Sequence, residues 1–304
     1  MVEVPAALRA RAVTQRSWGD WLARLPRLSD ELIEEWGLRV DGPAMSGRWS
    51  MVTEVRTEDD RRGVLKLTWP HREAETEHVA LRAWQGEGAV ELWRADPRRF
   101  ALLLERARPD RDLHAIDVVE ACEVVAGLYG RLHRPPLAQN RRLSRLCEEW
   151  AERLPGLAES NLIPRRFVSQ ADRLLHDFAA DPVTDSALIH SDLHFSNVLA
   201  ADREPWLAIA PEPLSGDPAY EVAPLLWNRW QEALRAPSPR SALLDRLYTV
   251  VDVAGLDEGR VRDWIVVRQV CKVLWTYEEH INGGAPIEHD RVTAATTLLK
   301  AVQR

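Results

Sequence analysis

Residues 188–200 read LIHSDLHFSNVLA, and this stretch determines how the rest of the chain is interpreted. A short apolar run at 187–189 gives way to a polar segment, and apolar residues resume at Val198 and Leu199. The polar segment carries His190, Asp192, His194 and Asn197. Short apolar runs bounded by polar residues are typical of buried strands. The stretch therefore predicts a strand, a polar loop and a second strand.

The spacing inside this loop predicts a chemistry. His-x-Asp, with Asn five positions after the Asp, is the order found in the kinase catalytic loop. There the carboxylate accepts the proton of the attacking hydroxyl, and the amide binds a magnesium ion. We therefore predict Asp192 as the catalytic residue and Asn197 as a metal ligand. His190 is expected to orient the loop, and His194 either supports the loop or faces the substrate.

The loop and the segment after it carry a family resemblance. HSDLHFSNVL at 190–199 and WLAIAPEPLSGDPAYEVAPLLWNRW at 206–230 resemble the aminoglycoside phosphotransferase family, in particular its streptomycin 6-phosphotransferase and hydroxyurea phosphotransferase-like branch. The likeness extends from about Asp41 onward. It implies an α+β, two-lobed protein kinase-like fold with a small antiparallel-sheet lobe and a larger, mainly helical lobe. It also implies ATP and Mg2+ as cofactors, and transfer of the γ-phosphate to a hydroxyl of an aminoglycoside such as streptomycin, or of a related small molecule.

One position departs from the family pattern in a way that bears on activity. Ala210 ends the strand WLAI, where the family has an Asp that would hold the metal. Glu212 is a candidate substitute ligand, because alternate residues of an extended chain point the same way. Otherwise the protein is a pseudokinase that binds nucleotide or ligand without turnover, or the Ala is an introduced change. Ser191 and Glu221, where the family usually has Gly and Asp, favour natural divergence.

A lysine in a short apolar strand is the candidate phosphate-binding residue. Lys66 lies within VLKL at 64–67, and in kinases the strand lysine holds the α/β-phosphates and pairs with a helix glutamate. The alternative is an edge-strand lysine whose ammonium reaches solvent. The following segment, 71–84, is predicted to be helical. It supplies Glu77 as the partner, with Glu73 in reserve.

The order of elements along the chain predicts the remaining parts of the lobes. Residues 100–105 resemble the last strand of the small lobe, so the backbone from Glu105 to Ala107 is expected to receive adenine. Asp217 is expected to support the catalytic loop from its turn. We predict a helical N-terminal extension at 1–37, a nucleotide-binding lobe at 38–109 and a helical lobe at 110–304. Within the extension, Ser29 and Asp30 are expected to begin a second short helix.

Composition limits the other classes of function. Lys and Arg number 40 against 47 Asp and Glu, a net charge of −7, which is unlike a nucleic-acid-binding protein. No segment approaches the ~18 apolar residues that span a bilayer, so we expect a cytoplasmic protein without membrane contact. The oligomeric state is left open. Three distant cysteines are expected to be buried thiols. They are Cys122, Cys147 and Cys271.

The residues give little support to two other catalytic arrangements, and they include glutamates that could form an acceptor pocket. His190, Asp192 and His194 could bind a metal in a hydrolase, but a further ligand cluster with convincing spacing is missing. Serines in the loop lack the Gly-x-Ser-x-Gly context of a nucleophile. A polycationic acceptor would call for an acidic pocket, and helical glutamates could supply it. These are Glu148, Glu149, Glu152, Glu232, Glu278 and Glu279.

Overall fold

The computed structural model describes residues 2–11, 16–284 and 286–303, and it divides the chain into two compact units. The first unit comprises Met1–Pro109 and Ala200–Glu212, and the second comprises Asp110–Leu199 and Pro213–Arg304. The chain passes from one unit to the other within strands β6 (Arg108–Asp112) and β9 (Val198–Ala200). These two strands form a small sheet with β10 (Leu207–Ala208), in the order β10-β9-β6.

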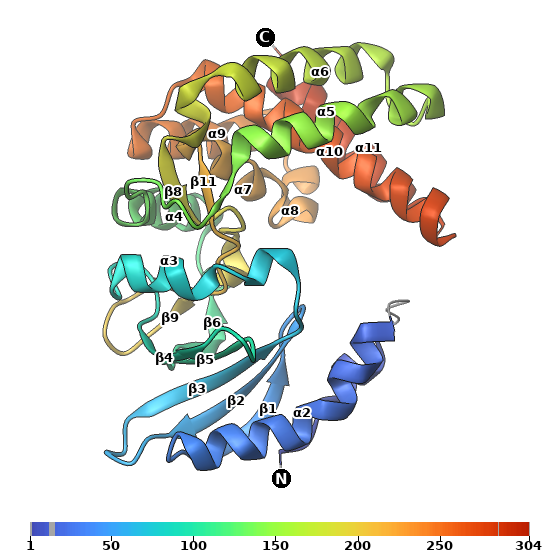
Figure 1. The fold of residues 1–304 in the computed structure, drawn as a ribbon. Helices are drawn as coiled ribbons and strands as arrows, with labels where there is room; N and C mark the ends of the chain where they lie inside the picture. Colours follow the sequence, from blue (N-terminus) through green and yellow to red (C-terminus); the bar gives the residue numbers. More distant parts are fainter. Residues whose placement is uncertain (1, 12–15, 285, 304) are drawn as a thin grey trace. The chain divides into compact units, whose positions relative to one another are not determined.

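The first unit is built on a five-stranded sheet with the order β1-β2-β3-β5-β4 (Figure 1). All neighbouring strands in it are antiparallel. The strands are β1 (Arg39–Ser46), β2 (Ser50–Arg56), β3 (Arg62–Thr68), β4 (Leu92–Asp96) and β5 (Ala101–Glu105). This is the small antiparallel sheet that the sequence predicted.

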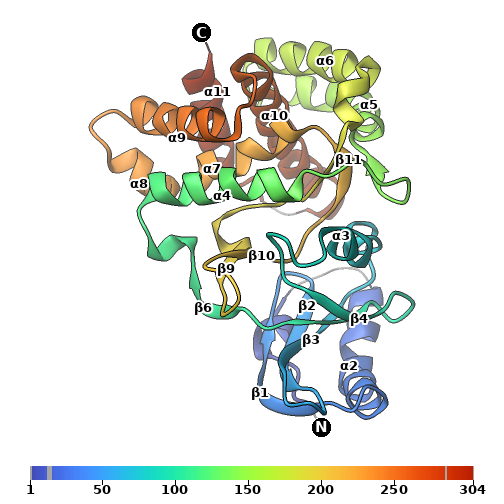
Figure 2. The same ribbon diagram turned by 90° about the vertical axis from the view of Figure 1, so that its left-hand side faces the viewer.

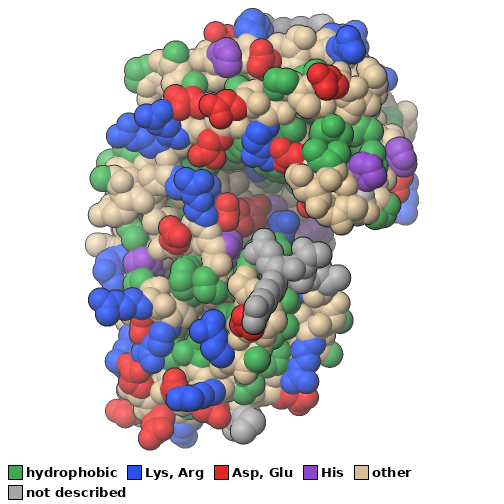
Figure 3. Space-filling view, turned by 45° about the vertical axis from the view of Figure 1, so that its right-hand side comes forward, with side chains coloured by type: hydrophobic (Ala, Val, Ile, Leu, Met, Phe, Trp, Pro, Cys, Tyr) green, Lys and Arg blue, Asp and Glu red, His purple; other side chains and the backbone are tan. Residues whose placement is uncertain are grey.

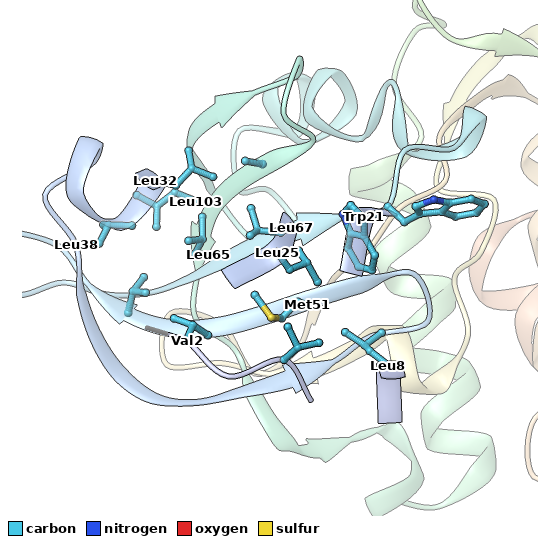
Figure 4. Packing of buried hydrophobic residues seen from close by; sticks show 14 of the residues in the cluster. Val2, Leu8, Trp21, Leu25, Leu32, Leu38, Met51, Leu65, Leu67 and Leu103 are labelled. Carbon is cyan, nitrogen blue, oxygen red and sulfur yellow. The ribbon is translucent and has the colours of Figure 1, made fainter. Parts of the chain in front are cut away.

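A long N-terminal helix covers one face of this sheet. Helix α2 (Arg16–Glu35) follows the short helix α1 (Ala6–Arg9), and its apolar side chains share one core with the strands (Figure 4). Leu25 and Leu32 of α2 are fully buried in this core, together with Met51, Leu65 and Leu67 of the sheet.

This packing changes two expectations about residues 1–37. The predicted second helix starting near Ser29 is wrong, because Ser29 lies inside α2 and is fully buried. Tertiary packing outweighs the preference of Ser and Asp for helix starts. The segment also belongs to the first unit instead of standing apart from it.

The other face of the sheet is the one toward which Lys66 points. Leu65 and Leu67 belong to the core shared with α2, so the alternation of β3 directs Lys66 to the opposite side. A short 3-10 helix, η1 (Arg72–Ala74), and α3 (Glu77–Trp84) follow β3. The predicted helix therefore starts later than His71, and α3 presents Glu77 in its first turn.

The second unit is mainly helical (Figure 2). Its helices are α4 (Val118–Leu132), α5 (Leu143–Ser160), α6 (Arg165–Ala180), α7 (Ala223–Trp227), α8 (Trp230–Arg235), α9 (Pro239–Ala254), α10 (Glu258–Gly283) and α11 (His289–Val302). A small sheet with the order β7-β11-β8 accompanies them. Its strands are β7 (Arg141–Arg142), β8 (Ala187–Ile189) and β11 (Leu214–Gly216). The predicted α+β class, with a small antiparallel sheet and a larger, mainly helical part, is thus confirmed.

The helix boundaries of this unit follow local signals in the sequence. Ser238 caps α9 with Pro239 at its first position, and Gly255 ends it with φ 64°. Asp257 caps α10, which ends at Gly284 with φ 67°. Glycine adopts this left-handed conformation without the steric penalty of a side chain.

Two further expectations can be compared with the fold. Cys122, Cys147 and Cys271 are free and buried, as predicted. The expected continuous lobe from 110 to 304 is interrupted, because Ala200–Glu212 belong to the first unit. Within the described residues, none of the helices combines the length and the apolar character that crossing a bilayer requires.

Candidate active site

The candidate phosphate-binding lysine forms a buried ion pair. Lys66 Nζ lies 2.6 Å from Glu77 Oε1, and the two side chains are only 11% and 5% exposed. The cation comes from β3 and the anion from the first turn of α3. Glu73, the reserve partner, lies in η1 before this helix begins. An ammonium held in this way can neutralise phosphate charge while its own position is fixed.

The candidate adenine-binding segment follows β5 in the same unit. Glu105 ends β5, and its carboxylate binds Arg203 at 2.9 Å and accepts a hydrogen bond from the Glu91 N–H at 3.1 Å. Ala107 lies between β5 and β6. The backbone N–H of Glu105 also donates to the Glu91 carbonyl at 2.9 Å, and adenine binding by this segment stays a prediction.

The predicted catalytic loop connects β8 to β9 in the second unit and includes the 3-10 helix η4 (Phe195–Asn197). Asn197 Nδ2 donates to the Asp192 carbonyl oxygen at 2.8 Å and to its Oδ2 at 3.3 Å. The Asp192 N–H lies 3.3 Å from His190 Nδ1. Three of the predicted residues therefore fix one another, and the amide group of Asn197 determines the position of the Asp192 carboxylate.

The Asp192 carboxylate remains ionised despite its surroundings. Burial raises its pKa, but His194, with Nε2 at 3.6 Å from Oδ2, opposes this effect by hydrogen bonding and by charge. The charges of His190 and Arg268 act in the same direction, and the net pKa lies below the ordinary carboxyl value. An anion in this place can orient a hydroxyl and accept its proton late in a transfer reaction.

Ser191, immediately before Asp192, has a strained backbone that is held by hydrogen bonds at both its N–H and its carbonyl group. Its φ of 64° is left-handed, a conformation in which L-residues pay a steric cost. Glu221 Oε1 accepts the Ser191 N–H at 2.7 Å, and Glu221 Oε2 lies 2.7 Å from His133 Nε2. Arg268 Nη1 donates to the Ser191 carbonyl at 3.4 Å.

Sequence reasoning missed the roles of three residues that hold the Ser191 backbone in place. Glu221 was noted only as a departure from the family's Asp, yet it is completely buried and bonded to the loop. His133 and Arg268 were not singled out at all. Their partners lie 88 and 77 residues away along the chain, so no local spacing could reveal them. The sequence shows only that Glu221 follows the turn Gly-Asp-Pro at 216–218.

Asp217 supports the region around the loop rather than the loop itself. Its carboxylate accepts hydrogen bonds from Ala219 N at 2.9 Å, Trp264 Nε1 at 2.6 Å and Arg260 Nε. It thereby ties η5 (Pro218–Val222), the short helix that carries Glu221, to α10. Asp217 thus acts on the catalytic loop through η5.

Ala210 and Glu212 lie in the first unit, after β10. Ala210 adopts φ 52°, so the extended alternation that would point Glu212 in the same direction is interrupted. The structural argument for Glu212 as a substitute ligand is therefore weakened, and its role stays a prediction. Glu212 is half-buried and interacts with at least one other group of the protein.

The oxygen donors of the second unit are of the kind that Mg2+ prefers. Asn197 donates through Nδ2, which leaves Oδ1 for a metal, and the Asp192 carboxylate lies beside it. Mg2+ commonly uses one or two carboxylates and keeps several waters. The described residues contain no cluster of three or more His, Cys, Asp or Glu suited to a metal.

Comparison with known proteins agrees with this arrangement. Residues 35–280 match the family described as aminoglycoside/hydroxyurea antibiotic resistance kinase. A streptomycin 6-kinase of Streptomyces glaucescens is 35% identical over 98% of this chain and 97% of its own length. A hydroxyurea phosphotransferase of Kitasatospora aureofaciens is 37% identical, over 98% and 86%. In fold, the chain is similar to an amicoumacin kinase solved with AMP-PNP, Ca2+ and its ligand (TM-score 0.59, 12% identity, 92% and 95% covered).

Proposed function

Because this chain belongs to the aminoglycoside/hydroxyurea antibiotic resistance kinases, we propose that it transfers the γ-phosphate of ATP to a hydroxyl group of a streptomycin-like aminoglycoside or a related small molecule. The observation that carries the proposal is the loop in which Asn197 holds both the backbone and the carboxylate of Asp192. An Asp followed by an Asn five residues later is the arrangement of the kinase catalytic loop, where the Asp accepts the hydroxyl proton and the Asn binds Mg2+.

Each residue has a defined task in this reaction. The Asp192 carboxylate accepts a hydrogen bond from the acceptor hydroxyl, orients its oxygen toward the phosphate and takes its proton as the bond to phosphorus forms. Lys66, held by Glu77, binds phosphate oxygens of the nucleotide. Asn197 Oδ1 would hold Mg2+, with Glu212 as the candidate second ligand. When bound, Mg2+ neutralises charge on the phosphate oxygens.

The surface is in keeping with a small-molecule substrate. On the face drawn in Figure 3, acidic and basic side chains are interspersed, and no broad basic area covers it. Together with the net charge of −7, this argues against a nucleic-acid substrate on that face.

A second candidate function is nucleotide or ligand binding without turnover. The observation in its favour is Ala210, which offers no side-chain oxygen where the family pattern has Asp. In this case Lys66, Glu77 and the Asp192 loop would still bind nucleotide, and phosphate transfer would be absent in the parent protein.

The test is the substitution Asp192→Asn, assayed by phosphate transfer from labelled ATP to a panel of aminoglycosides and by nucleotide binding. We expect binding to persist and transfer to fall by about 100-fold or more, because the amide keeps the shape but cannot accept the proton. Asp177→Asn, at an exposed site on α6, is the matched control. Transfer at the parent rate in Asp192→Asn would remove this residue from the mechanism. A parent with no transfer would favour the binding function.

A further inference from the structure

Two cations lie one helical turn apart on α10, next to the loop that carries Asp192. Arg268 donates to the carbonyl of Ser191 at 3.4 Å and to that of Tyr220 at 3.1 Å. Its guanidinium also stacks over the Tyr220 ring, 4.1 Å from the centroid. Arg268 is therefore fixed against the catalytic loop, and Lys272 follows four residues later on the same face of the helix.

Lys272 and Arg268 share one aromatic ring. Lys272 Nζ lies 3.8 Å from the centroid of the Trp227 ring, and the Arg268 guanidinium carbon lies 5.4 Å from it. Trp227 comes from the end of α7, so two elements build the arrangement. The two glutamates that follow Lys272 on α10 are paired with arginines, Glu278 with Arg153 and Glu279 with Arg291 at 3.9 Å.

The environment of Lys272 disfavours its charge. Burial, together with the charges of Arg268 on α10 and Arg291 on α11, lowers the pKa of its ammonium to about 8. Arg291 is itself paired with Glu288 at 2.6 Å. No negative group contributes to this balance. A half-buried cation beside two others is destabilised unless an anion joins it.

Part of the acidic field expected for a polycationic acceptor is neutralised in this unit. Several of the glutamates proposed to supply it are engaged by arginines at ion-pair distance. The pairs are Glu148–Arg145, Glu232–Arg229 and Glu278–Arg153. Next to the catalytic loop, Arg268 acts on the Asp192 carboxylate by its charge, and Lys272 follows it on α10.

We propose that Arg268 and Lys272, set over the Trp227 ring, form an oxyanion-binding subsite beside the catalytic loop. Its ligand is a phosphate or carboxylate group, because a guanidinium and an ammonium bind such oxygens by charge-assisted hydrogen bonds. The source is either a carboxylate on the acceptor molecule or the phosphoryl group of a phosphorylated product. The subsite goes beyond the proposed transfer reaction, because it binds an anion whether or not the chain turns over.

The scarcity of lysine makes a direct test possible, because the chain has Lys only at 66, 272 and 300. In protein labelled with 13C at the lysine ε-carbon, NMR titration gives the pKa of each ammonium separately. Titrations are run in inorganic phosphate, in acetate and in chloride at equal ionic strength. We expect phosphate or acetate to raise the pKa of Lys272 by about one unit relative to chloride, a ~tenfold preference for the protonated form. The exposed Lys300 should stay unchanged.

The expected pH dependence has a defined sign. Since Lys272 carries its charge below a pKa of about 8, anion binding is strongest below that pH and weakens as the pH rises through it. With an anion bound, Lys272 loses its proton at a higher pH, because the opposite charge favours the protonated lysine.

Substitutions at the lysines identify the subsite. Lys272→Met keeps the side chain's apolar length, and we expect it to weaken phosphate or acetate binding by about tenfold. Lys300→Met is the matched control and should leave binding unchanged. A preference for phosphate indicates a phosphoryl group as ligand, and a preference for acetate indicates an acceptor carboxylate. Either supports the subsite.

One result overturns the subsite. If the pKa of Lys272 is identical in phosphate, acetate and chloride, the proposal is wrong. This titration uses the parent protein, so it does not depend on whether a variant folds. Binding of phosphate at Lys66 is read from a separate signal, so the nucleotide site and the subsite fail or succeed independently.

Discussion

At position 210 the backbone conformation matters as much as the missing oxygen. Ala210 has φ 52°, in the left-handed region that Gly, Asn and Asp adopt more readily than Ala. An Asp at this position would therefore fit the existing backbone. The family's Asp and the observed conformation agree with each other, whereas the Ala meets neither the conformational preference nor the need for a ligand.

We expect Ala210→Asp to increase magnesium-dependent phosphate transfer to an aminoglycoside by about 100-fold, the size of effect seen for one electrostatic group in a transition state. Ala210→Gly is the matched control, since it relieves the backbone without adding an oxygen. Both are assayed with labelled ATP across acceptors. If Ala210→Asp is no more active than Ala210→Gly while nucleotide still binds, the cause of any inactivity lies beyond this position.

At the scale of elements, two short 3-10 helices of the second unit begin in the same way. Asp181 precedes Pro182 and accepts the Val183 N–H, and Asp217 precedes Pro218 and accepts the Ala219 N–H. Both carboxylates also bind Arg260, which joins the two helix starts to α10. They differ in burial, with side-chain exposures of 31% for Asp181 and 3% for Asp217.

This pair predicts a difference in stability. Asp217→Asn should reduce the free energy of unfolding by about 2–3 kcal/mol, because the buried hydrogen bonds from Trp264 and Arg260 lose their charged acceptor while Arg260 keeps Asp181. Asp181→Asn removes the same kind of contacts near solvent and should cost about 1 kcal/mol. Urea denaturation of the two variants measures both values. Equal costs would show that burial of the Asp217 carboxylate contributes nothing to its role.

Elements with short-range signals could be predicted from the sequence, and contacts between distant segments could not. The order His190, Asp192, Asn197 and the pairing of Lys66 with Glu77 depend on spacings of a few residues or on adjacent elements. Glu221 instead reaches Ser191 across 30 residues, and only the fold brings them together. The predicted helix start at Ser29 was wrong for a related reason, because burial in the shared core outweighs a local preference. Because position 210 holds neither Gly nor Asn, its left-handed conformation could not be predicted from the sequence.

At the scale of the whole molecule, nucleotide binding should appear as added stability. A ligand that binds only the folded state stabilises it by about 2.7 kcal/mol at 100 times its Kd. We expect ATP with Mg2+ to raise the thermal midpoint of the parent chain, and metal-free ATP to raise it less. A rise that is independent of the metal would favour the binding function without turnover.

Lys66 provides the matching substitution. Lys66→Met alone should reduce stability by about 3–5 kcal/mol, because Glu77 would remain charged and buried. Lys66→Met with Glu77→Gln removes that charge, and we expect it to recover much of the loss while ATP no longer raises the midpoint. Thermal denaturation monitored by circular dichroism measures both effects. A nucleotide-dependent rise equal to the parent's in the double variant would contradict the assignment of Lys66.

The contribution of Ala200–Glu212 to the first unit has a consequence for how the protein is made. Ala208 exchanges hydrogen bonds with Gly88 and Val90, and Arg203 binds Glu105, 98 residues earlier in the chain. On the ribosome, the N-terminal unit therefore cannot complete its fold until residue 212 has emerged, long after its own sheet has been translated. Domains usually fold in order of synthesis. Here the nascent small unit has to wait for a segment encoded more than 90 codons downstream.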